Sequence, residues 1–302
     1  MSSVLYDAPG PRARRNTLVG TVIAGIVLAA LAVLVVIQLG NNDQLDGAKW
    51  GPLYNPANPY FVATWGRLLS GLVVTIQAAA ITLVLALAIG TLLVVMRVTS
   101  ARAFRWIVVT FIEGLRGLPV VVTIFFAARV LPELGLTLPP LWYVVIGLTA
   151  YNCVIIAEIL RSGINALPRG QAEAANALGM SRLQVLRLIL LPQAFRLMLP
   201  ALISQLVVIV KDTSLGFVVF GFADFVREAN TVIQFFGGQL QISFPLQMFL
   251  TVALVFILIN YGLGKLAEYI NRRGSRLSRR RPPDPAMVEL EVAESVTTGR
   301  AG

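Results

Sequence analysis

Six polar residues stand inside stretches of the sequence that are apolar enough for a lipid bilayer, and they are the candidates for chemistry: Arg116, Asn152, Lys211, Asp212, Thr213 and Ser214. Ionisable groups in a membrane interior are costly and are therefore functional candidates by default. Arg116 lies about ten residues into its apolar stretch, or about 15 Å along a helix, so we expect it near the bilayer midplane. A guanidinium group there would attract a carboxylate, and the neutral residues of the set would add hydrogen bonds.

The same charges could instead form a structural network. Glu113 precedes Arg116 by three residues and would share its helix face, and Asp212 could reach Arg116 across helices. Lys211 and Asp212 are adjacent in sequence and point in different directions on a helix, so each needs a partner elsewhere. Both hypotheses, substrate pathway and structural network, stay open at this point.

The composition excludes several classes of function. Of the 302 residues, 57% are hydrophobic and only 13% are charged, with a net charge of +10 and no histidine. Without imidazole groups, the commonest metal ligand and general base are missing, so we expect no catalytic and no metal site. The arginines occur in short runs beside apolar stretches, which favours membrane contact over nucleic-acid binding. Cys153, the single cysteine, is expected to be a packing residue.

Apolar stretches long enough to cross a bilayer predict an all-α integral membrane protein of about six transmembrane helices. They cover residues 18–39, 68–96, 106–130, 140–160, 197–222 and 245–268. The first is longer than the apolar core of a signal peptide, so we expect an uncleaved span. Gly114, Gly117 and Pro119 interrupt the third, which predicts a kink there.

The charges between these stretches predict one topology. Basic residues gather at 12–15, 97–105, 161–196 and 272–281, so the positive-inside rule places these segments and both termini in the cytoplasm. The protein is then expected in the cytoplasmic membrane as a multi-pass chain.

The predicted segments follow from this topology: a cytoplasmic N-terminal segment 1–17, an additional helix 18–39, an extracytoplasmic loop 40–66 with a short helix, a five-helix core 67–270 and a disordered basic tail 271–302. The arginines of the tail are expected to lie against anionic lipid headgroups. Two further outward loops are expected, one with Pro132, Glu133 and Gly135 and one at 223–244, where Asp224, Arg227 and Glu228 would be solvated charges. Glu158 and Arg161, three residues apart, are expected to form a surface ion pair.

The one long cytoplasmic loop, 161–196, carries a helical pattern. Good helix formers run from Gln171 to Leu178, and Gly179 is expected to end that helix. Ser181 and Gln184 have capping-box spacing, which predicts a second short helix from Arg182 to Leu190, before Pro192. The prediction is a helix, a sharp glycine turn and another helix.

This pattern resembles the EAA loop of ABC-importer permeases. The residues that carry the resemblance are Glu173, Ala174, Ala175, Leu178, Gly179, Ile189, Leu190, Leu191 and Pro192. In that family the loop forms coupling helices that sit in a groove on a cytoplasmic ATPase subunit. The resemblance therefore implies an ATPase-coupling role for Glu173, Ala174, Ala175, Leu178, Gly179, Ile189, Leu191 and Pro192, and a type I ABC importer permease fold.

Three further stretches are similar to polar amino-acid uptake permeases: Glu113 to Pro119, Ala157 to Gly163 and Lys211 to Leu215. The resemblance implies an importer subunit for a polar amino acid, with glutamate and glutamine among the candidates. The implied partners are cytoplasmic ABC ATPase subunits, a second permease subunit, an extracytoplasmic amino-acid-binding protein and the bilayer.

No nucleotide site is expected in the chain itself. Gly262, Gly264 and Lys265 are followed by Leu266 and do not complete a P-loop. ATP and Mg are therefore expected on the partner, and the chain is not an enzyme by itself. The alternatives are a permease for another small solute, an ion-gradient-driven secondary transporter, which needs no coupling loop, and a structural or signalling membrane scaffold.

Overall fold

The computed structural model describes residues 10–278, with side chains described up to residue 269, and all regular elements in this range are helices. In chain order they are α1 (Pro11–Asn41), α2 (Gly47–Tyr54), α3 (Phe61–Thr99), α4 (Arg102–Arg116), α5 (Val120–Glu133), α6 (Pro140–Asn165), α7 (Arg169–Ala177), α8 (Arg182–Gln184), the π-helix η1 (Val185–Leu190), α9 (Leu191–Asp212), α10 (Leu215–Phe220), α11 (Phe225–Gln239) and α12 (Pro245–Ser278). The described chain divides into two compact units: one runs to residue 66 and includes 232–250, and the other comprises 67–231 and the described residues from 251 on.

Five helical runs of the described chain are long and apolar enough to cross a bilayer: Pro11–Asn41, Phe61–Thr99, Pro140–Asn165, Arg182–Phe220 and Pro245–Tyr269. α4 and α5 pass the same test only as a pair, bent by 100° at a short break. The six expected spans therefore agree with the structure when this bent pair is counted as one.

The break between α4 and α5 lies where a kink was expected. Pro119 has no backbone N–H, adopts an extended conformation (φ −62°, ψ 138°) and serves as the N-cap of α5. Arg116 is the last residue of α4, directly before this break. The predicted kink is therefore confirmed, and the depth of Arg116 in the bilayer stays a prediction.

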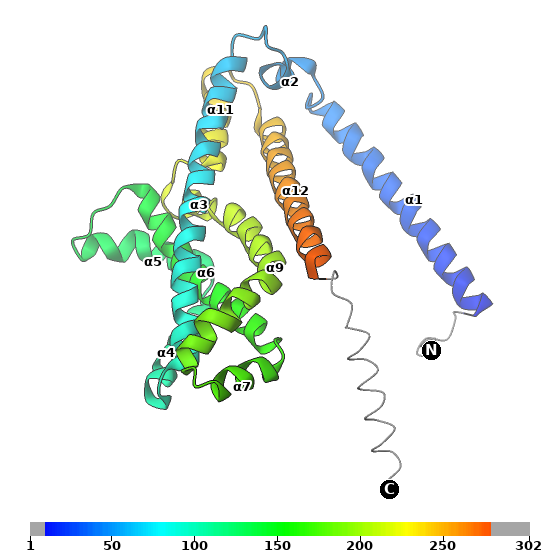
Figure 1. Cartoon of the computed structure of the whole chain (residues 1–302). Helices are drawn as coiled ribbons and strands as arrows, with labels where there is room; N and C mark the ends of the chain where they lie inside the picture. The colour runs from blue at the N-terminus through cyan, green and yellow to red at the C-terminus, as the bar shows by residue number, and fades with distance from the viewer. Residues whose placement is uncertain (1–9, 279–302) are drawn as a thin grey trace. The chain divides into compact units, whose positions relative to one another are not determined.

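α6 is the central helix of the second unit. It packs against α4, α5 and α9, and 67% of its most apolar 18 residues are buried. Gly147 allows the close approach of α5, since a Cβ at this position would lie only 2.5 Å from the Cα of Ile124. At one end of this unit, Figure 1 shows the short helix α7 in green, beyond the ends of α6 and α9.

The first unit is held together largely by aromatic contacts. Tyr60, Phe235, Phe236 and Phe244 form a chain of ring contacts, of which the Phe236–Phe244 stack is the tightest at 4.5 Å between centroids. Gln247 donates a hydrogen bond to the carbonyl of Gln44 at 2.9 Å. α1 has no buried residue and is apolar along most of its length, as a helix surrounded by lipid would be.

Two segments predicted as outward loops contain helices. Residues 40–66 include α2, the short helix expected there, which Asp46 caps by accepting the N–H of Ala48 at 3.0 Å. Residues 223–244 were predicted as a loop, but most of them form α11. The outward orientation of both segments stays a prediction.

Both ends of the described chain are more helical than expected. α1 begins at Pro11, not at residue 18, because proline is well suited to the first position of a helix. α12 continues to Ser278, so residues 271–278 of the expected disordered tail are helical, as arginine is a good helix former. The rest of that tail, 279–302, and residues 1–9 lie outside the described residues.

Candidate functional site

The expected helix, glycine turn and helix are present in residues 169–192, which we call the coupling segment. α7 ends in a Schellman motif: the N–H of Met180 donates to the carbonyl of Ala175 at 3.2 Å, and the N–H of Gly179 donates to that of Asn176 at 2.9 Å. Gly179 has φ +80°, a left-handed conformation that glycine adopts without steric cost. The prediction that Gly179 ends this helix is confirmed.

The capping box that follows the turn is also confirmed. The N–H of Gln184 donates to the Ser181 hydroxyl at 3.4 Å, and the Ser181 N–H donates to the side chain of Gln184 at 2.8 Å. The helix continues as η1, in which the N–H of Leu191 donates to the carbonyl of Leu186, five residues back. The predicted end before Pro192 is wrong, since the wider π turn leads directly into α9 and places Pro192 in its first turn.

One face of the coupling segment is open to the outside of the chain. Glu173 and Ala174 are exposed, and Leu178 is 84% exposed. Ala175 is buried on the opposite face of α7, which packs against η1. Among the other coupling candidates, Gly179 and Pro192 are exposed, and Ile189 and Leu191 are half-buried. An exposed acidic residue on α7 and an exposed leucine at its end, followed by a turn that two capping motifs fix, are suited to contact another protein.

Arg116, the proposed carboxylate-binding residue, pairs with Glu113 within α4. Its Nη1 lies 3.2 Å from Oε2 of Glu113, and both side chains are about half exposed, at 43% and 54%. The expected alternative partner was Asp212, but among the described residues Arg116 makes its ion pair with Glu113 alone. The structural network is therefore limited to one helix turn and leaves the guanidinium accessible.

Asn152 is fully buried and uses both ends of its amide. Its Nδ2 donates to the carbonyl of Leu148 at 2.8 Å, and its Oδ1 accepts from Nε2 of Gln205 at 2.7 Å. Because the contact with Gln205 joins α6 to α9, it favours a structural role for Asn152. No local pattern indicates the Gln205 partner, which lies 53 residues away.

The polar residues at the end of α9 do not share one environment. Lys211 is exposed and Asp212 is half-buried, and neither forms an ion pair with another described residue. Thr213 is fully buried, and its hydroxyl donates to the carbonyl of Val210 at 2.8 Å. Ser214 is half-buried. The structure therefore does not bring these four residues together with Arg116 through direct contacts.

The three charges expected to be solvated in the loop after α10 make contacts within the second unit. Asp224 is completely buried and caps α11, with Oδ1 accepting the N–H of Arg227 at 2.9 Å. Burial raises the pKa of the Asp224 carboxyl above its usual value, although the Arg227 N–H favours the charged form. Glu228 pairs with Arg67 at 3.2 Å, and the Arg227 guanidinium donates to the carbonyl of Gly221. The expectation of solvated charge is therefore wrong for Asp224.

Arg97 adds an unexpected partner to Glu158 and Arg161. One Glu158 oxygen accepts from Nε and Nη2 of Arg161 at 2.9 and 2.8 Å, and the other accepts from Nη1 of Arg97. The Glu158 and Arg97 side chains are only 17% and 20% exposed. The expected surface pair is thus a largely buried cluster that joins α3 to α6, and its charge-assisted hydrogen bonds are of the strong kind. Arg97 lies 61 residues from Glu158, so no local pattern could reveal the contact.

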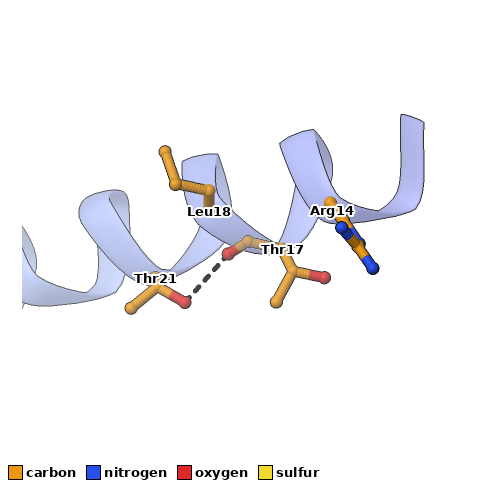
Figure 2. Close-up of a pocket in the computed structure, with 4 residues that line it drawn as sticks. All are labelled: Arg14, Thr17, Leu18 and Thr21. Atoms are coloured by element: carbon orange, nitrogen blue, oxygen red, sulfur yellow. Dashed lines mark hydrogen bonds between the residues drawn. The ribbon is translucent and has the colours of Figure 1, made fainter. Parts of the chain in front are cut away.

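A hollow on α1, lined by Arg14, Thr17, Leu18 and Thr21, offers little to a ligand (Figure 2). The Thr21 hydroxyl donates to the carbonyl of Thr17 at 2.8 Å, and the Thr17 hydroxyl donates to that of Ala13 at 2.9 Å. Only the Arg14 guanidinium remains for an outside partner. Among the described residues, no group of three His, Cys, Asp or Glu side chains could hold a metal ion.

The comparisons with known proteins agree with this arrangement. A family model described as "Binding-protein-dependent transport system inner membrane component" matches residues 89–276. The glutamate transport system permease protein GluD of Corynebacterium glutamicum is 41% identical over 243 residues, which cover 78% of this chain and 83% of that protein. The glutamate/aspartate import permease protein GltK of Escherichia coli is 33% identical over 226 residues, which cover 72% of this chain and 95% of that protein. The probable glutamine ABC transporter permease protein GlnP of Bacillus subtilis is 32% identical over 206 residues, which cover 68% of this chain and 93% of that protein.

Solved structures show the same likeness. A chain from the crystal structure of an amino acid ABC transporter with histidines superposes with a TM-score of 0.62 at 27% identity, covering 70% of this chain and 96% of that one. A chain of the inward-facing MetNI methionine ABC transporter superposes with a TM-score of 0.53 at 17% identity and shows a shared fold. The coupling segment lies entirely within the matched family range.

Proposed function

The chain belongs to the family of binding-protein-dependent transport inner membrane components, and on this premise we propose that a separate ATPase drives it through the coupling segment. It is the membrane-spanning subunit of an ABC importer for polar amino acids. The observation that supports the driving contact is the outward face of α7, where Glu173 and the 84% exposed Leu178 precede a turn that two capping motifs hold in place. Such a segment, joined to the spanning helices, would transmit force because packed helices shift between discrete arrangements and do not deform smoothly.

We propose an acidic amino acid, glutamate, as the substrate. The support is the 41% identity to a protein named as a glutamate transport system permease and the 33% identity to one named for glutamate and aspartate import. Glutamine is the second candidate, because a relative named for glutamine is 32% identical. The half-exposed guanidinium of Arg116 would offer a carboxylate a bidentate partner in either case.

The partners that this function requires are cytoplasmic ABC ATPase subunits, an extracytoplasmic amino-acid-binding protein and a second permease subunit. ATP and Mg would bind the ATPase, and hydrolysis would occur there. Within one chain the polar candidates do not form a single site, because Arg116, Asn152 and Thr213 make separate contacts. A second copy or a related chain would therefore complete the pathway. The complex would lie in the cytoplasmic membrane with both termini of this chain inside.

Reconstitution tests this proposal. Proteoliposomes containing the chain, its cognate ATPase and saturating binding protein should take up labelled glutamate only with Mg-ATP on the ATPase side, including after ionophores collapse all ion gradients. Unlabelled glutamate should compete at lower concentration than glutamine. Uptake that needs an ion gradient and no ATP would contradict the proposal and support a secondary transporter, whereas stronger competition by glutamine would reassign the substrate.

A further inference from the structure

α7 is held in place by little apolar packing. It is a helix of nine residues, and Ala175 is its only buried side chain. Burying one methyl group contributes about 1 kcal/mol or less. A hollow lined by residues from the end of α6, the start of α7 and Leu190 of η1 lies beside it, so close packing does not fix the start of α7. Another contact must therefore position the helix.

Gln171 and Gln193 supply that contact. Gln171 lies one turn before Ala175 and therefore on the inward face of α7. Nε2 of Gln193, in the first turn of α9, donates to Oε1 of Gln171 at 3.0 Å. Both side chains are half-buried. This is the one hydrogen bond between side chains that joins α7 to α9 among the described residues.

The same Gln193 nitrogen also donates to the backbone carbonyl of Ile189 at 3.0 Å. A carbonyl can only accept, so this contact requires the nitrogen end of the Gln193 amide to face η1 and Gln171. Gln171 must then present its oxygen. The pair has a fixed polarity, with Gln193 as the donor and Gln171 as the acceptor.

The Ile189 carbonyl lies in a stretch of helix that lacks one backbone donor. η1 bonds across five residues, and Pro192, the next residue but two, has no backbone N–H to contribute. The Gln193 side chain therefore fixes a helical turn that is short of backbone donors and, through the same nitrogen, the start of α7. Movement of α7 is thereby linked to the first turn of a membrane-spanning helix.

We propose that Gln171 and Gln193 form a latch, a positioning pair that makes α7 and α9 move together when the ATPase acts on the coupling segment. The inference rests on the proposed function, because a latch matters only if force enters through α7. Neither residue contacts substrate or nucleotide in this account. Without the latch, α7 would pivot on the turns at its two ends, and ATP hydrolysis would continue with less transport.

The polarity of the pair provides a sharp test with matched variants. Gln171→Glu keeps the acceptor oxygen, and Gln193→Glu removes the donor and places a carboxylate against the Ile189 carbonyl. The two substitutions introduce the same charge and almost the same volume at positions that touch one another. In reconstituted complexes with saturating binding protein, amino acid transported per ATP hydrolysed should be close to wild type for Gln171→Glu and about fivefold lower for Gln193→Glu, the effect of one typical hydrogen bond.

A second pair of variants covers the case in which a carboxylate at position 193 prevents assembly. Gln193→Leu should lower the amount of amino acid transported per ATP hydrolysed as Gln193→Glu does. Adding Gln171→Leu should lower this ratio little further, because the two residues act through one bond. Wild-type ratios for both Gln193 variants would overturn the latch. Equal losses in the two glutamate variants would do the same, because the polarity would then be wrong.

Failure of the latch can be distinguished from failure of the proposed function. Glu173→Lys, on the outward face of α7, tests the ATPase contact without touching the latch. If Glu173→Lys uncouples transport while the Gln193 variants keep the wild-type ratio, the latch is wrong and the coupling role stands. If Glu173→Lys also leaves the ratio unchanged, the coupling role itself is contradicted.

Discussion

The outward face of the coupling segment, with Glu173, is open to a partner, whereas Asn152 of α6 and Thr213 at the end of α9 bond to groups within the second unit. Glu173 and Leu178 are exposed on α7, and no ion pair to Glu173 is found in the described part of the chain. Asn152 and Thr213, by contrast, are fully buried and hydrogen-bonded within the second unit. The first region is therefore arranged for a partner, and the second for the internal order of the helices.

Reversing the charge at Glu173 should have the largest effect. Removing one member of a charge pair buried at an interface typically costs about 2–5 kcal/mol, so Glu173→Lys should reduce ATP-driven uptake by at least about thirtyfold. Membrane insertion should be unchanged because the side chain is exposed. Glu133→Lys, a charge reversal of another exposed acid, is the matched control and should retain uptake.

A substitution in the internal region should instead affect stability. Gly147→Ala would place a Cβ 2.5 Å from the Cα of Ile124, and the resulting overpacking of α5 against α6 should cost about 1–3 kcal/mol. We expect a lower Tm of the detergent-purified chain. Gly114→Ala serves as the control, since nothing lies within 4 Å of a Cβ there. Equal Tm values for the two variants would show that α6 is not tightly packed.

The glycine turn of the coupling segment should respond to backbone conformation alone. Gly179 has φ +80°, and a Cβ added there would meet no atom within 4 Å, so Gly179→Val is penalised by strain, of about 1–2 kcal/mol, and not by a clash. Transport per ATP should fall about tenfold. Gly179→Asn should keep most of it, because asparagine tolerates the left-handed conformation. Similar ratios for valine and asparagine would contradict the role of the turn.

The smallest effect is expected at Asn152. Polar pairs between membrane helices contribute about 0.6 kcal/mol on average, so a double-mutant cycle of Asn152→Ala and Gln205→Ala should give a coupling energy of that order in the free energy of unfolding. The KM for the transported amino acid should be unchanged. A marked rise in KM for Asn152→Ala, with stability unaffected, would place this residue in the substrate pathway and weaken the contrast between the two regions.

Short-range signals allowed the coupling segment to be predicted from sequence. Gly179 and the Ser181–Gln184 capping box act within four residues, so their types and spacing determine the turn and the helix start directly. The exit from this segment was predicted less well. Pro192 normally signals a helix end, but the π turn of η1 carries the helix past it. Such widened turns have no clear sequence signature.

Contacts between distant helices could not be predicted in the same way. Hydropathy identifies which stretches are helical, but Asn152 with Gln205, and Arg97 with Glu158, meet only because of how α3, α6 and α9 pack. Asp224 was misjudged for a related reason: aspartate in a polar segment is usually solvated, and only the tertiary fold buries it. Both hypotheses for the buried polar residues, substrate pathway and structural network, depend on such contacts between distant helices.

Cross-linking at the tip of α7 tests the central claim most directly, because the claim is that this segment contacts an ATPase. Cys153, the one native cysteine, is buried, so Leu178→Cys adds a thiol that a photoreactive reagent can label selectively. Leu136→Cys, at a position 53% exposed in the predicted outward loop between α5 and α6, provides the control. In the assembled complex, we predict an adduct between Leu178→Cys and the ATPase subunit and none from Leu136→Cys. The absence of that adduct from an active complex with fully labelled Leu178→Cys would contradict the account.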